Sequence, residues 1–346
     1  MSIMRNNLKM IRCCIVGASG YTGAELVKLI KRHPKMQLDA CFVSENSDDA
    51  NKSIGLVHAE LQGICDIVTQ PINTGVIASL ADEFDAIFLA TPHEASHDWA
   101  DDLAFKHAKV FDLSGAFRLS DVAIFKQFYG FEHSQPTVLQ ESVYGLAEWN
   151  ADIIKTAKFV AIPGCYPTAS LLAIKPLMVK GLIAEGHYPI INATSGVSGA
   201  GKKLALGSHF CSVSLQAYGV LGHRHTPEIN EHAGADVIFT PHLGQYKRGI
   251  LATVTMKLKR SSSESDVVDA FQSAYADKAM IRLKNTWPKI DDVAHTAFCD
   301  IAWKYDANSH YLVVSTAIDN LLKGAASQAI QCANLAFGFE SSEGLL

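Results

Sequence analysis

The sequence predicts an α/β fold of two domains, the first a doubly wound parallel sheet and the second a mixed α+β domain. The chain has 346 residues, about twice the roughly 150 of a typical domain. Over its first part, strand-like and helix-like segments alternate, which is typical of a parallel sheet covered by helices. After about residue 159 longer strand-like runs follow, most without a helix of similar size between them, which indicates a mixed sheet with helices on one face.

Composition limits the kinds of partner. With 48% hydrophobic and 19% charged residues the chain should be globular, and 30 basic against 35 acidic residues leave no basic excess for nucleic acid. Eight scattered cysteines with no CxxC pair suggest the reduced thiols of a cytoplasmic protein. The apolar runs are too short for a signal peptide or a membrane span, so we expect neither export nor a membrane.

The elements of the first domain follow in order. A strand at residues 12–16 runs into a glycine turn and then a helix whose apolar positions fall within residues 24–30 and which ends at His33 and Pro34. A second strand is predicted at residues 38–43. Two further strands and the helix between them are predicted at residues 85–92, 109–114 and 94–107.

The second domain is predicted to be rich in strands. A helix is expected at residues 265–279, and the final stretch at residues 319–337 returns to helical spacing with small residues on one face. We expect this final stretch to pack against the first domain. The strands are predicted at residues 188–193, 235–240, 249–258 and 310–318.

The glycine turn is the first candidate site. Gly17, Gly20 and Gly23 follow a strand and open a helix, where backbone N–H groups and the helix dipole can hold a pyrophosphate. Ser19 and Thr22 could add hydroxyl donors. The spacing GxxGxxG differs from the GxGxxG fingerprint in the place of its first glycine, so a purely structural turn is the alternative to a Rossmann-type nucleotide site.

The end of the second strand bears on the choice of dinucleotide. Ser44, Ser47 and Lys52 could contact a ribose 2′-phosphate, whereas Glu45 would oppose it if it pointed inward. The segment favours NADP over NAD, and an ordinary polar loop is the alternative.

Cys165 is the candidate nucleophile. It lies in a segment with Gly164 and Pro167 that suggests a tight turn leading into a helix over residues 169–177. A thiol at a helix N-terminus feels the positive end of the dipole, so we expect a lowered pKa. The alternative is that Cys165 is a small buried hydrophobe.

The candidate base is His225. Glu228 follows three residues later, so a turn or a first helical turn could put both on one side, with the carboxylate orienting the imidazole. The alternative is a solvated polar loop. No HExxH motif or cysteine-rich ligand set is present, so no metal is expected.

Two further segments could bind anions. A glycine- and serine-rich loop at residues 195–202 ends in Lys202, and such loops present N–H groups to phosphate or carboxylate. The guanidinium of Arg248 matches a pair of carboxylate or phosphoryl oxygens. Either segment could instead be a surface turn. Together they favour a small anionic substrate.

Eight segments carry a resemblance that covers nearly the whole chain. The sequence resembles the N-acetyl-gamma-glutamyl-phosphate reductase family, with Cys165 and its flanking residues as the most specific element and the glycine turn as the least. The first few residues have no counterpart, and we interpret them as a disordered lead. The segments, beginning at residues 17, 111, 144, 160, 192, 223, 240 and 319, are GASGYTGAEL, FDLSGAFRL, YGLAEW, VAIPGCYPT, NATSGVSGAGK, HRHTPEI, TPHLGQYKRGIL and DNLLKGAASQAIQCAN.

The resemblance implies a reaction and a division of labour. The expected reaction is NADPH-dependent reduction of N-acetyl-L-glutamyl 5-phosphate to N-acetyl-L-glutamate 5-semialdehyde and phosphate in arginine biosynthesis, through a thioester on Cys165. Residues 1–160, completed by a C-terminal helix at residues 320–346, would form the dinucleotide-binding domain. Residues 161–319 would form a catalytic and oligomerisation domain like the catalytic half of glyceraldehyde-3-phosphate dehydrogenase, in a homodimer or homotetramer.

The resemblance also implies roles for single residues. His225 would be the acid/base group with Glu228 nearby to orient it or to contact substrate, and His223 is the second choice for the acid/base role. Substrate would contact Arg118, Ser198, Gly199, Lys202, His223 and Arg248. The cofactor NADP(H) would contact Gly17, Ser19, Gly20, Tyr21, Thr22, Gly23, Ser44, Ser47, Ser114, Ser195, Gly196 and Asn320.

Two other functions remain open on the sequence. A related acyl-phosphate reductase, of the aspartate-semialdehyde or aminoadipate-semialdehyde type, would use the same thiol chemistry. A non-catalytic dinucleotide-sensing protein would keep the fold and leave Cys165 and His225 incidental.

Overall fold

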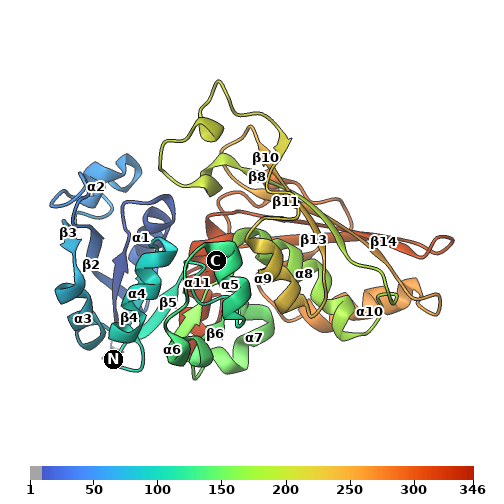
Figure 1. Ribbon diagram of the computed structural model, residues 1–346, viewed down its shortest axis with the longest axis horizontal. Coiled ribbons are helices and arrows are strands. Elements are labelled where there is room, and N and C mark those ends of the chain that lie inside the picture. Colours follow the sequence, from blue (N-terminus) through green and yellow to red (C-terminus); the bar gives the residue numbers. More distant parts are fainter. Residues whose placement is uncertain (1–9) are drawn as a thin grey trace, which may run out of the picture.

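The structure is a computed structural model that describes residues 10–346, so the lead predicted for the first few residues lies outside the described part. Figure 1 shows two lobes, each built on one sheet, with the C-terminal helix α11 (Ser327–Ala336) between them. The α/β fold with a parallel sheet and a second mixed sheet is confirmed. Among the described residues, no helix is long and apolar enough to cross a membrane.

The first sheet has seven strands in the order β3-β2-β1-β4-β5-β7-β6, and every neighbouring pair is parallel. The order reverses between β1 and β4, and in such sheets ligands bind at this point, beyond the carboxyl ends of the strands. The strands are β1 (Ile11–Val16), β2 (Met36–Ser44), β3 (Thr69–Ile72), β4 (Ala86–Leu89), β5 (Lys109–Asp112), β6 (Val143–Tyr144) and β7 (Phe159–Ala161).

Helices cover this sheet, as the alternating pattern predicts. The two predicted from the sequence are α1 and α4, and the others are short or weakly periodic. Short 3-10 turns lie at Ala59–Leu61 here and at Val197–Ala200, Leu206–Ser208 and Ile290–Asp292 in the rest of the chain. The helices are α1 (Tyr21–Arg32), α2 (Ile54–Val57), α3 (Thr74–Glu83), α4 (His93–Leu103), α5 (Val122–Tyr129), α6 (Pro136–Glu141) and α7 (Ala147–Ile154).

The second sheet is mixed, with seven strands in the order β12-β13-β14-β11-β8-β10-β9. β8 and β10 are parallel, and each ends a few residues later than the sequence predicts. The strand β13 is not predicted from the sequence. The strands are β8 (Ile190–Gly196), β9 (Gln216–Ala217), β10 (Ile238–Gly244), β11 (Ile250–Lys257), β12 (Ile281–Leu283), β13 (Cys299–Asp306) and β14 (Tyr311–Ile318).

Three helices accompany this sheet: α8 (Cys165–Val179), α9 (His225–Ala233) and α10 (Glu264–Tyr275). The apolar residues of α8 and α10 share one buried core with the strands, so these helices cover one face of the sheet. After β14 the chain forms a π-helical turn, Leu322–Ala326, and continues as α11. The small apolar residues of α11 are buried in the same core as those of α1 and β1, which brings the end of the chain to the first sheet.

Candidate active site

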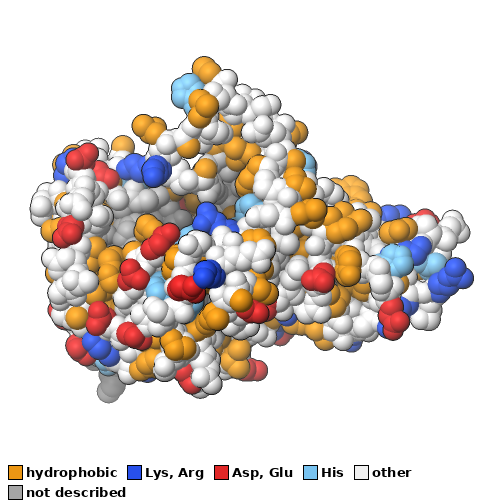
Figure 2. All heavy atoms as spheres, viewed as in Figure 1, with side chains coloured by type: hydrophobic (Ala, Val, Ile, Leu, Met, Phe, Trp, Pro, Cys, Tyr) orange, Lys and Arg blue, Asp and Glu red, His pale blue; other side chains and the backbone are white. Residues whose placement is uncertain are grey.

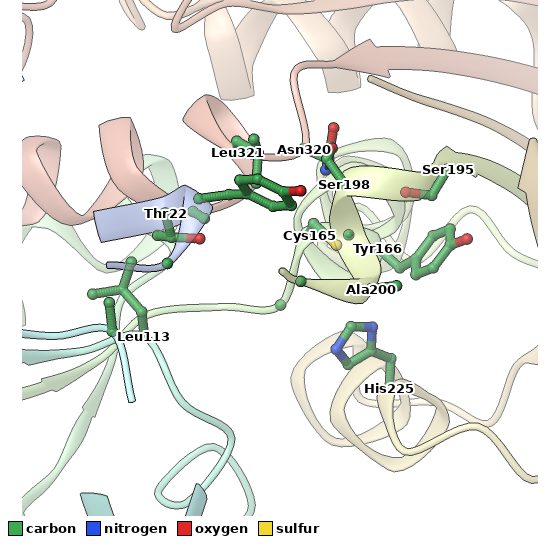
Figure 3. A pocket seen from close by; sticks show the side chains of 18 of the residues that line it. Thr22, Leu113, Cys165, Tyr166, Ser195, Ser198, Ala200, His225, Asn320 and Leu321 are labelled. Atoms are coloured by element: carbon green, nitrogen blue, oxygen red, sulfur yellow. The ribbon is translucent and has the colours of Figure 1, made fainter. Parts of the chain in front are cut away.

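A cavity of about 710 Å³ lies between the two lobes. Residues from both lobes and from the segment after β14 line it, and Figure 2 shows that this face of the molecule is hollowed between the lobes. In Figure 3, Cys165 lies near the middle of the cavity, with Thr22 of the first lobe on one side and Tyr166 and His225 on the other. The residues expected to bind cofactor and the residues expected to act on substrate therefore meet in one space.

Cys165 is the first residue of α8, directly after Gly164, which supplies no side-chain cap. All eight cysteines are free thiols, and Cys165 is half-buried, whereas six others are buried and Cys211 is exposed. Burial raises the pKa of the Cys165 thiol to about 11, although the N–H of Tyr166 and the charge of Arg118 act in the opposite direction. The expectation of a lowered pKa is therefore wrong for this structure, because desolvation of the thiolate outweighs the helix terminus.

His225 reaches the start of α8. A Cβ atom at position 164 would lie 2.6 Å from His225 Nε2, so only glycine lets the imidazole come so close. Burial lowers the pKa of His225 well below its ordinary value, with nearby His223 and Arg118 acting in the same direction. Its Nδ1 atom is buried and has no hydrogen-bond partner among the described residues. His225 is therefore a neutral imidazole with Nε2 towards Gly164.

Glu228 is fully buried and holds Gly164 rather than His225. Its Oε1 accepts hydrogen bonds from the Gly164 N–H and the Tyr144 hydroxyl, both at 2.8 Å, and its Oε2 accepts from Arg118 Nη1 at 3.4 Å. The prediction that His225 and Glu228 share one side of a helical turn is confirmed, since both reach Gly164 from α9. The prediction that the carboxylate orients the imidazole is wrong, because these three donors occupy it.

His223 and Arg118 also line the cavity. His223 Nδ1 accepts a hydrogen bond from the His225 N–H at 3.1 Å, and burial together with Arg224 lowers the pKa of His223 to about 4. The buried Arg118 donates from Nε to the Ile162 carbonyl and from Nη2 to the Leu113 carbonyl, both at 2.7 Å. These carbonyl groups fix the guanidinium beside Gly164.

The glycine turn has the close packing that its spacing predicts. Gly17 has a φ of +91°, and a Cβ atom there would lie 2.2 Å from the carbonyl oxygen of Ala90. A Cβ atom on Gly23 would lie 2.5 Å from the carbonyl oxygen of Gly17. Gly20 precedes α1 without a side-chain cap, so the first N–H groups of the helix are free of capping and face an open cavity. This cradle fits a pyrophosphate.

The turn also lines a second cavity, of about 560 Å³. Both cavities share Gly20 and residues 90–92, and the second one extends to residues 44–46 at the end of β2. The two cavities thus lie next to each other along the carboxyl ends of β1, β2 and β4, and this arrangement suits a dinucleotide. Tyr21, Thr22 and Gly23 line the first cavity, and Gly17 and Ser19 line the second.

Three expected cofactor contacts differ in their placement. Ser44 lines the second cavity beside Glu45. Ser47 is not among its lining residues, and its hydroxyl accepts a hydrogen bond from the Asp49 N–H at 3.2 Å. Ser114 is buried apart from both cavities and donates to Asp112 Oδ2 at 2.8 Å. The structure therefore brings Ser44 to the cofactor cradle, but not Ser47 or Ser114.

The loop at residues 195–202 lies in the cavity with Asn320. Ser195 and Gly196 end β8, and Ser198 and Gly199 follow in a 3-10 turn. Asn320 donates to Ser198 Oγ at 2.9 Å. Lys202 Nζ donates to the Ser19 carbonyl at 3.4 Å, across the space between the lobes. The loop therefore touches the glycine turn.

Arg248 does not line the cavity that contains Cys165. Its Nη1 atom pairs with Glu25 of α1 at 2.9 Å and its Nε atom pairs with Asp319 at 2.5 Å. It borders another cavity, of about 930 Å³, with residues of α1 and of the loop after β8. The expected role in substrate binding conflicts with this placement, because two carboxylates already hold the guanidinium.

Several lining residues were not singled out from the sequence, among them His93, Tyr129, Arg224 and Gly324. His93 follows β4 after three residues, and its position beyond the carboxyl end of a parallel strand was a usable signal. A Cβ atom on Gly324 would lie 2.7 Å from Cys165 Cβ, so the π-helical turn packs against the cysteine. For Tyr129 and Gly324 the sequence carries no local signal, since their contacts come from distant segments.

Comparisons with known proteins agree with this architecture. Residues 12–157 match the model of the semialdehyde dehydrogenase NAD-binding domain, and residues 165–320 match that of the semialdehyde dehydrogenase dimerisation domain. A probable aspartate-semialdehyde dehydrogenase from Pseudomonas aeruginosa has the same fold, with a TM-score of 0.71 at 18% identity over 95% of this chain and 99% of that one. Aspartate semialdehyde dehydrogenase with NADP from Candida albicans gives a TM-score of 0.68 at 14% identity over 94% and 98%.

Relatives at higher sequence identity indicate a particular family of semialdehyde dehydrogenases. N-acetyl-gamma-glutamyl-phosphate reductase of Pseudoalteromonas atlantica is 60% identical over 97% of this chain and 98% of its own length. The protein of that name from Salmonella typhi is 51% identical over 97% of this chain and 100% of its own length.

Fold and site together define a two-domain semialdehyde dehydrogenase, an oxidoreductase with a dinucleotide-binding domain and a cysteine in the cavity between its lobes. Within that class the chain belongs to the N-acetyl-gamma-glutamyl-phosphate reductase family.

Proposed function

We propose that this chain reduces N-acetyl-L-glutamyl 5-phosphate to N-acetyl-L-glutamate 5-semialdehyde and phosphate, with NADPH as the reductant, in arginine biosynthesis. The observation that carries the proposal is the shared cavity, in which a half-buried cysteine at an uncapped helix start lies near the glycine turn. The names of the relatives, at 50–60% identity over nearly the whole chain, support the substrate.

NADPH, when bound, supplies a hydride to the carbon that Cys165 carries as a thioester. The residues that fit it are those of the glycine turn, whose free N–H groups suit the pyrophosphate, and Ser44, which lines the second cavity. Ser195 and Asn320 line the cavity of Cys165 and suit the nicotinamide end. The preference for the 2′-phosphorylated cofactor rests on Ser44, with Glu45 beside it as the group that would oppose it.

The chain's own chemistry centres on Cys165 and His225. The thiol passes its proton to His225 Nε2 while sulfur attacks the acyl carbon, and the bond from carbon to the phosphate oxygen breaks to release phosphate. A thioester remains. After reduction, the oxyanion collapses, sulfur leaves as the thiolate and takes back the proton from His225 Nε2. A neutral imidazole close to Gly164 suits this role.

Two groups position this pair. Glu228 holds the Gly164 N–H, which fixes the residue before the nucleophile. Arg118, fixed by two carbonyl groups beside Gly164, is a cation close to where phosphate leaves. Ser198, Gly199, Lys202 and His223 line the same cavity and would complete the substrate site.

We further propose a homodimer or homotetramer that assembles through residues 161–319 and acts in the cytoplasm, with residues 1–160 and 320–346 as the dinucleotide-binding domain. The match of residues 165–320 to a dimerisation domain supports this assembly. Eight unpaired thiols suit a reducing compartment.

The first test uses the reverse reaction, because the acyl phosphate is labile. Protein, N-acetyl-glutamate semialdehyde, phosphate and NADP are mixed, and the absorbance of NADPH is followed. We expect phosphate-dependent reduction of NADP, lost in Cys165→Ser and kept in the matched control Cys211→Ser, whose thiol is exposed away from the cavity. Activity with aspartate semialdehyde instead would change the substrate and keep the mechanism, and cofactor binding without turnover on either aldehyde would contradict the proposal.

A further inference from the structure

Three hydrogen-bond donors gather at one end of the active-site cavity, and we call them the donor cluster: His93, Tyr129 and Arg224. His93 is the first residue of α4, Tyr129 the last of α5, and Arg224 directly precedes α9. Both lobes therefore contribute to the cluster. Figure 2 shows basic and histidine side chains in the hollow between the lobes.

The contact between His93 and Arg224 brings two donors together. His93 Nδ1 accepts a hydrogen bond from the Gly115 N–H at 2.7 Å. A neutral imidazole that accepts at Nδ1 carries its proton on Nε2, so Nε2 is a donor. Arg224 Nη1, which can only donate, lies 2.7 Å from that Nε2 atom. Both atoms are donors, so neither offers the other an acceptor.

Tyr129 contributes a third donor without an acceptor. Its hydroxyl is buried and has no hydrogen-bond partner among the described residues. Its ring is fixed by Phe125, stacked at a centroid distance of 4.6 Å, and by His93, edge to face at 5.1 Å. Arg224 Cζ lies 6.0 Å from the ring centroid. Burial raises the pKa of Tyr129 to about 12, so the hydroxyl keeps its proton and can donate.

We propose that the donor cluster binds the phosphoryl group of the acyl phosphate, and inorganic phosphate in the reverse direction. This assignment rests on the proposed function and adds three residues to its substrate site. Three donors without acceptors match the terminal oxygens of a phosphoryl group, and Arg224 matches two of them at once. The oxygens would enter between Arg224 Nη1 and His93 Nε2 and give each an acceptor.

The position of Arg118 favours the phosphoryl group over the carboxylate at the other end of the substrate. Arg118 Nη1 is close to Gly164, the residue before Cys165. The acyl carbon must lie at the Cys165 sulfur for attack, and the phosphoryl group is one oxygen away from that carbon. The charge of Arg118 acts on both Tyr129 and His93, which indicates that the cluster continues from it. Phosphate binding would also tie α4 of the first lobe to α9 of the second.

The test compares Tyr129→Phe and Arg224→Gln with the wild type in the reverse reaction, varying each substrate in turn. Tyr129→Phe removes a hydroxyl that has no hydrogen-bond partner within residues 10–346 and keeps the ring contacts, so folding should not suffer. Arg260→Gln removes the same charge as Arg224→Gln at an exposed position outside the cavity and serves as the matched control. We expect the KM for phosphate to rise roughly tenfold or more in both cluster variants, because each loses a hydrogen bond to a charged group. The KM values for semialdehyde and NADP should change less than twofold.

A calorimetric titration of the same proteins with inorganic phosphate separates this inference from the proposed function, since it needs no turnover. Weaker phosphate binding in both variants than in wild type and Arg260→Gln supports the cluster, even if the wild type fails to turn over N-acetyl-glutamate semialdehyde. An unchanged phosphate KM and affinity would overturn it. So would a rise in the semialdehyde KM alone, which would assign the cluster to the carboxylate, or a wild type that shows no phosphate binding.

Discussion

At the scale of single residues, Gly164 is the point where the reactive groups meet. Its N–H is held by Glu228, and the space that a side chain would fill is taken by His225 Nε2 and Arg118 Nη1. Burial raises the pKa of Cys165 and lowers that of His225, so the free protein holds a neutral thiol beside a neutral imidazole. The proton must therefore pass from Cys165 to His225 when substrate is bound, because the free protein does not hold Cys165 as a thiolate.

The choice of dinucleotide can be tested at Ser44. We expect Ser44→Asp to raise the KM for NADPH roughly tenfold or more and to leave the KM for NADH nearly unchanged. The new carboxylate would repel a 2′-phosphate but accept a hydrogen bond from a ribose 2′-hydroxyl. Initial rates with each cofactor at saturating substrate measure both constants.

Ser47→Asp is the matched control, because it adds the same charge three residues further on, outside the lining of the second cavity. Ser47→Asp should raise the KM for NADPH several-fold less than Ser44→Asp does. Equal losses for NADPH and NADH in Ser44→Asp would show that this position does not distinguish the two cofactors.

Sequence reasoning at this scale works where the signal is local. Cys165 and His225 were singled out because their neighbours in the chain predict a turn and a helix start, and the structure has both. The pKa of Cys165 was predicted with the wrong sign, since its burial comes from segments far away in the chain. Arg248 was assigned to substrate because its guanidinium matches a pair of carboxylate or phosphoryl oxygens. Its actual partners, Glu25 and Asp319, were missed because they are distant from it in sequence.

At the scale of elements, four helices begin at the cavity. Tyr21, His93, Cys165 and His225 are the first residues of α1, α4, α8 and α9, and all four line it. Helix starts present free N–H groups and the positive end of the dipole, so the elements themselves favour anionic ligands. Of these four, the sequence predicted the helices at α1, α4 and α8 and left α9 as a turn or a first helical turn.

The π-helical turn Leu322–Ala326 gives a second prediction at this scale. A Cβ atom at position 324 would lie 2.7 Å from Cys165 Cβ and 3.2 Å from its Cα, and no rotation of a side chain can relieve that contact. We expect Gly324→Ala to lower kcat roughly tenfold or more and to destabilise the protein by about 1–3 kcal/mol, because either the turn or the cysteine must shift. Steady-state rates and urea unfolding measure the two effects.

Gly207→Ala is the control, since a Cβ atom there meets nothing within 4 Å. It should change neither rate nor stability by much. A Gly324→Ala protein with wild-type kcat would mean that the π-helical turn yields without moving Cys165.

The elements that the sequence missed are short or depend on tertiary pairing. β6 has two residues, and α5, α6 and α7 are short helices between β5 and β7. Strands such as β1 and β4 were found because their consecutive apolar residues are buried on both faces. The π-helical turn has no sequence signature, and its Lys323 is fully buried against Glu148 and Gln331, a pairing that only the folded chain reveals.

At the scale of the whole molecule, charged residues tie the lobes together around the cavity. Arg248 joins α1 of the first lobe to Asp319 after the last strand of the second, and Lys202 reaches the glycine turn from the loop after β8. Because a partly buried guanidinium paired with two carboxylates is costly to break, the Arg248 contacts fix the relative placement of cofactor and substrate sites. Arg248 therefore positions the lobes that form the site, and it does not line the cavity that contains Cys165.

The burial of neutral histidines predicts how the stability of the whole protein depends on pH. Burial lowers the pKa of His93 to about 3 and those of His133, His223 and His232 to about 4, against an ordinary value of 6.5. Between pH 6.5 and 4 the unfolded chain therefore binds protons that the folded protein does not. Stability should be at its full value above pH 6.5 and fall as the pH drops to 4, by up to about 1.4 kcal/mol per pH unit for each histidine. Urea unfolding at pH 7.5 and 5.5 measures the loss, and proton uptake on unfolding at pH 5 should approach one per histidine.

In His232→Gln, which can still donate to the Arg118 carbonyl, the loss of stability between these pH values should be smaller than in the wild type. Equal stability at pH 7.5 and 5.5 would mean that these side chains are already protonated in the fold.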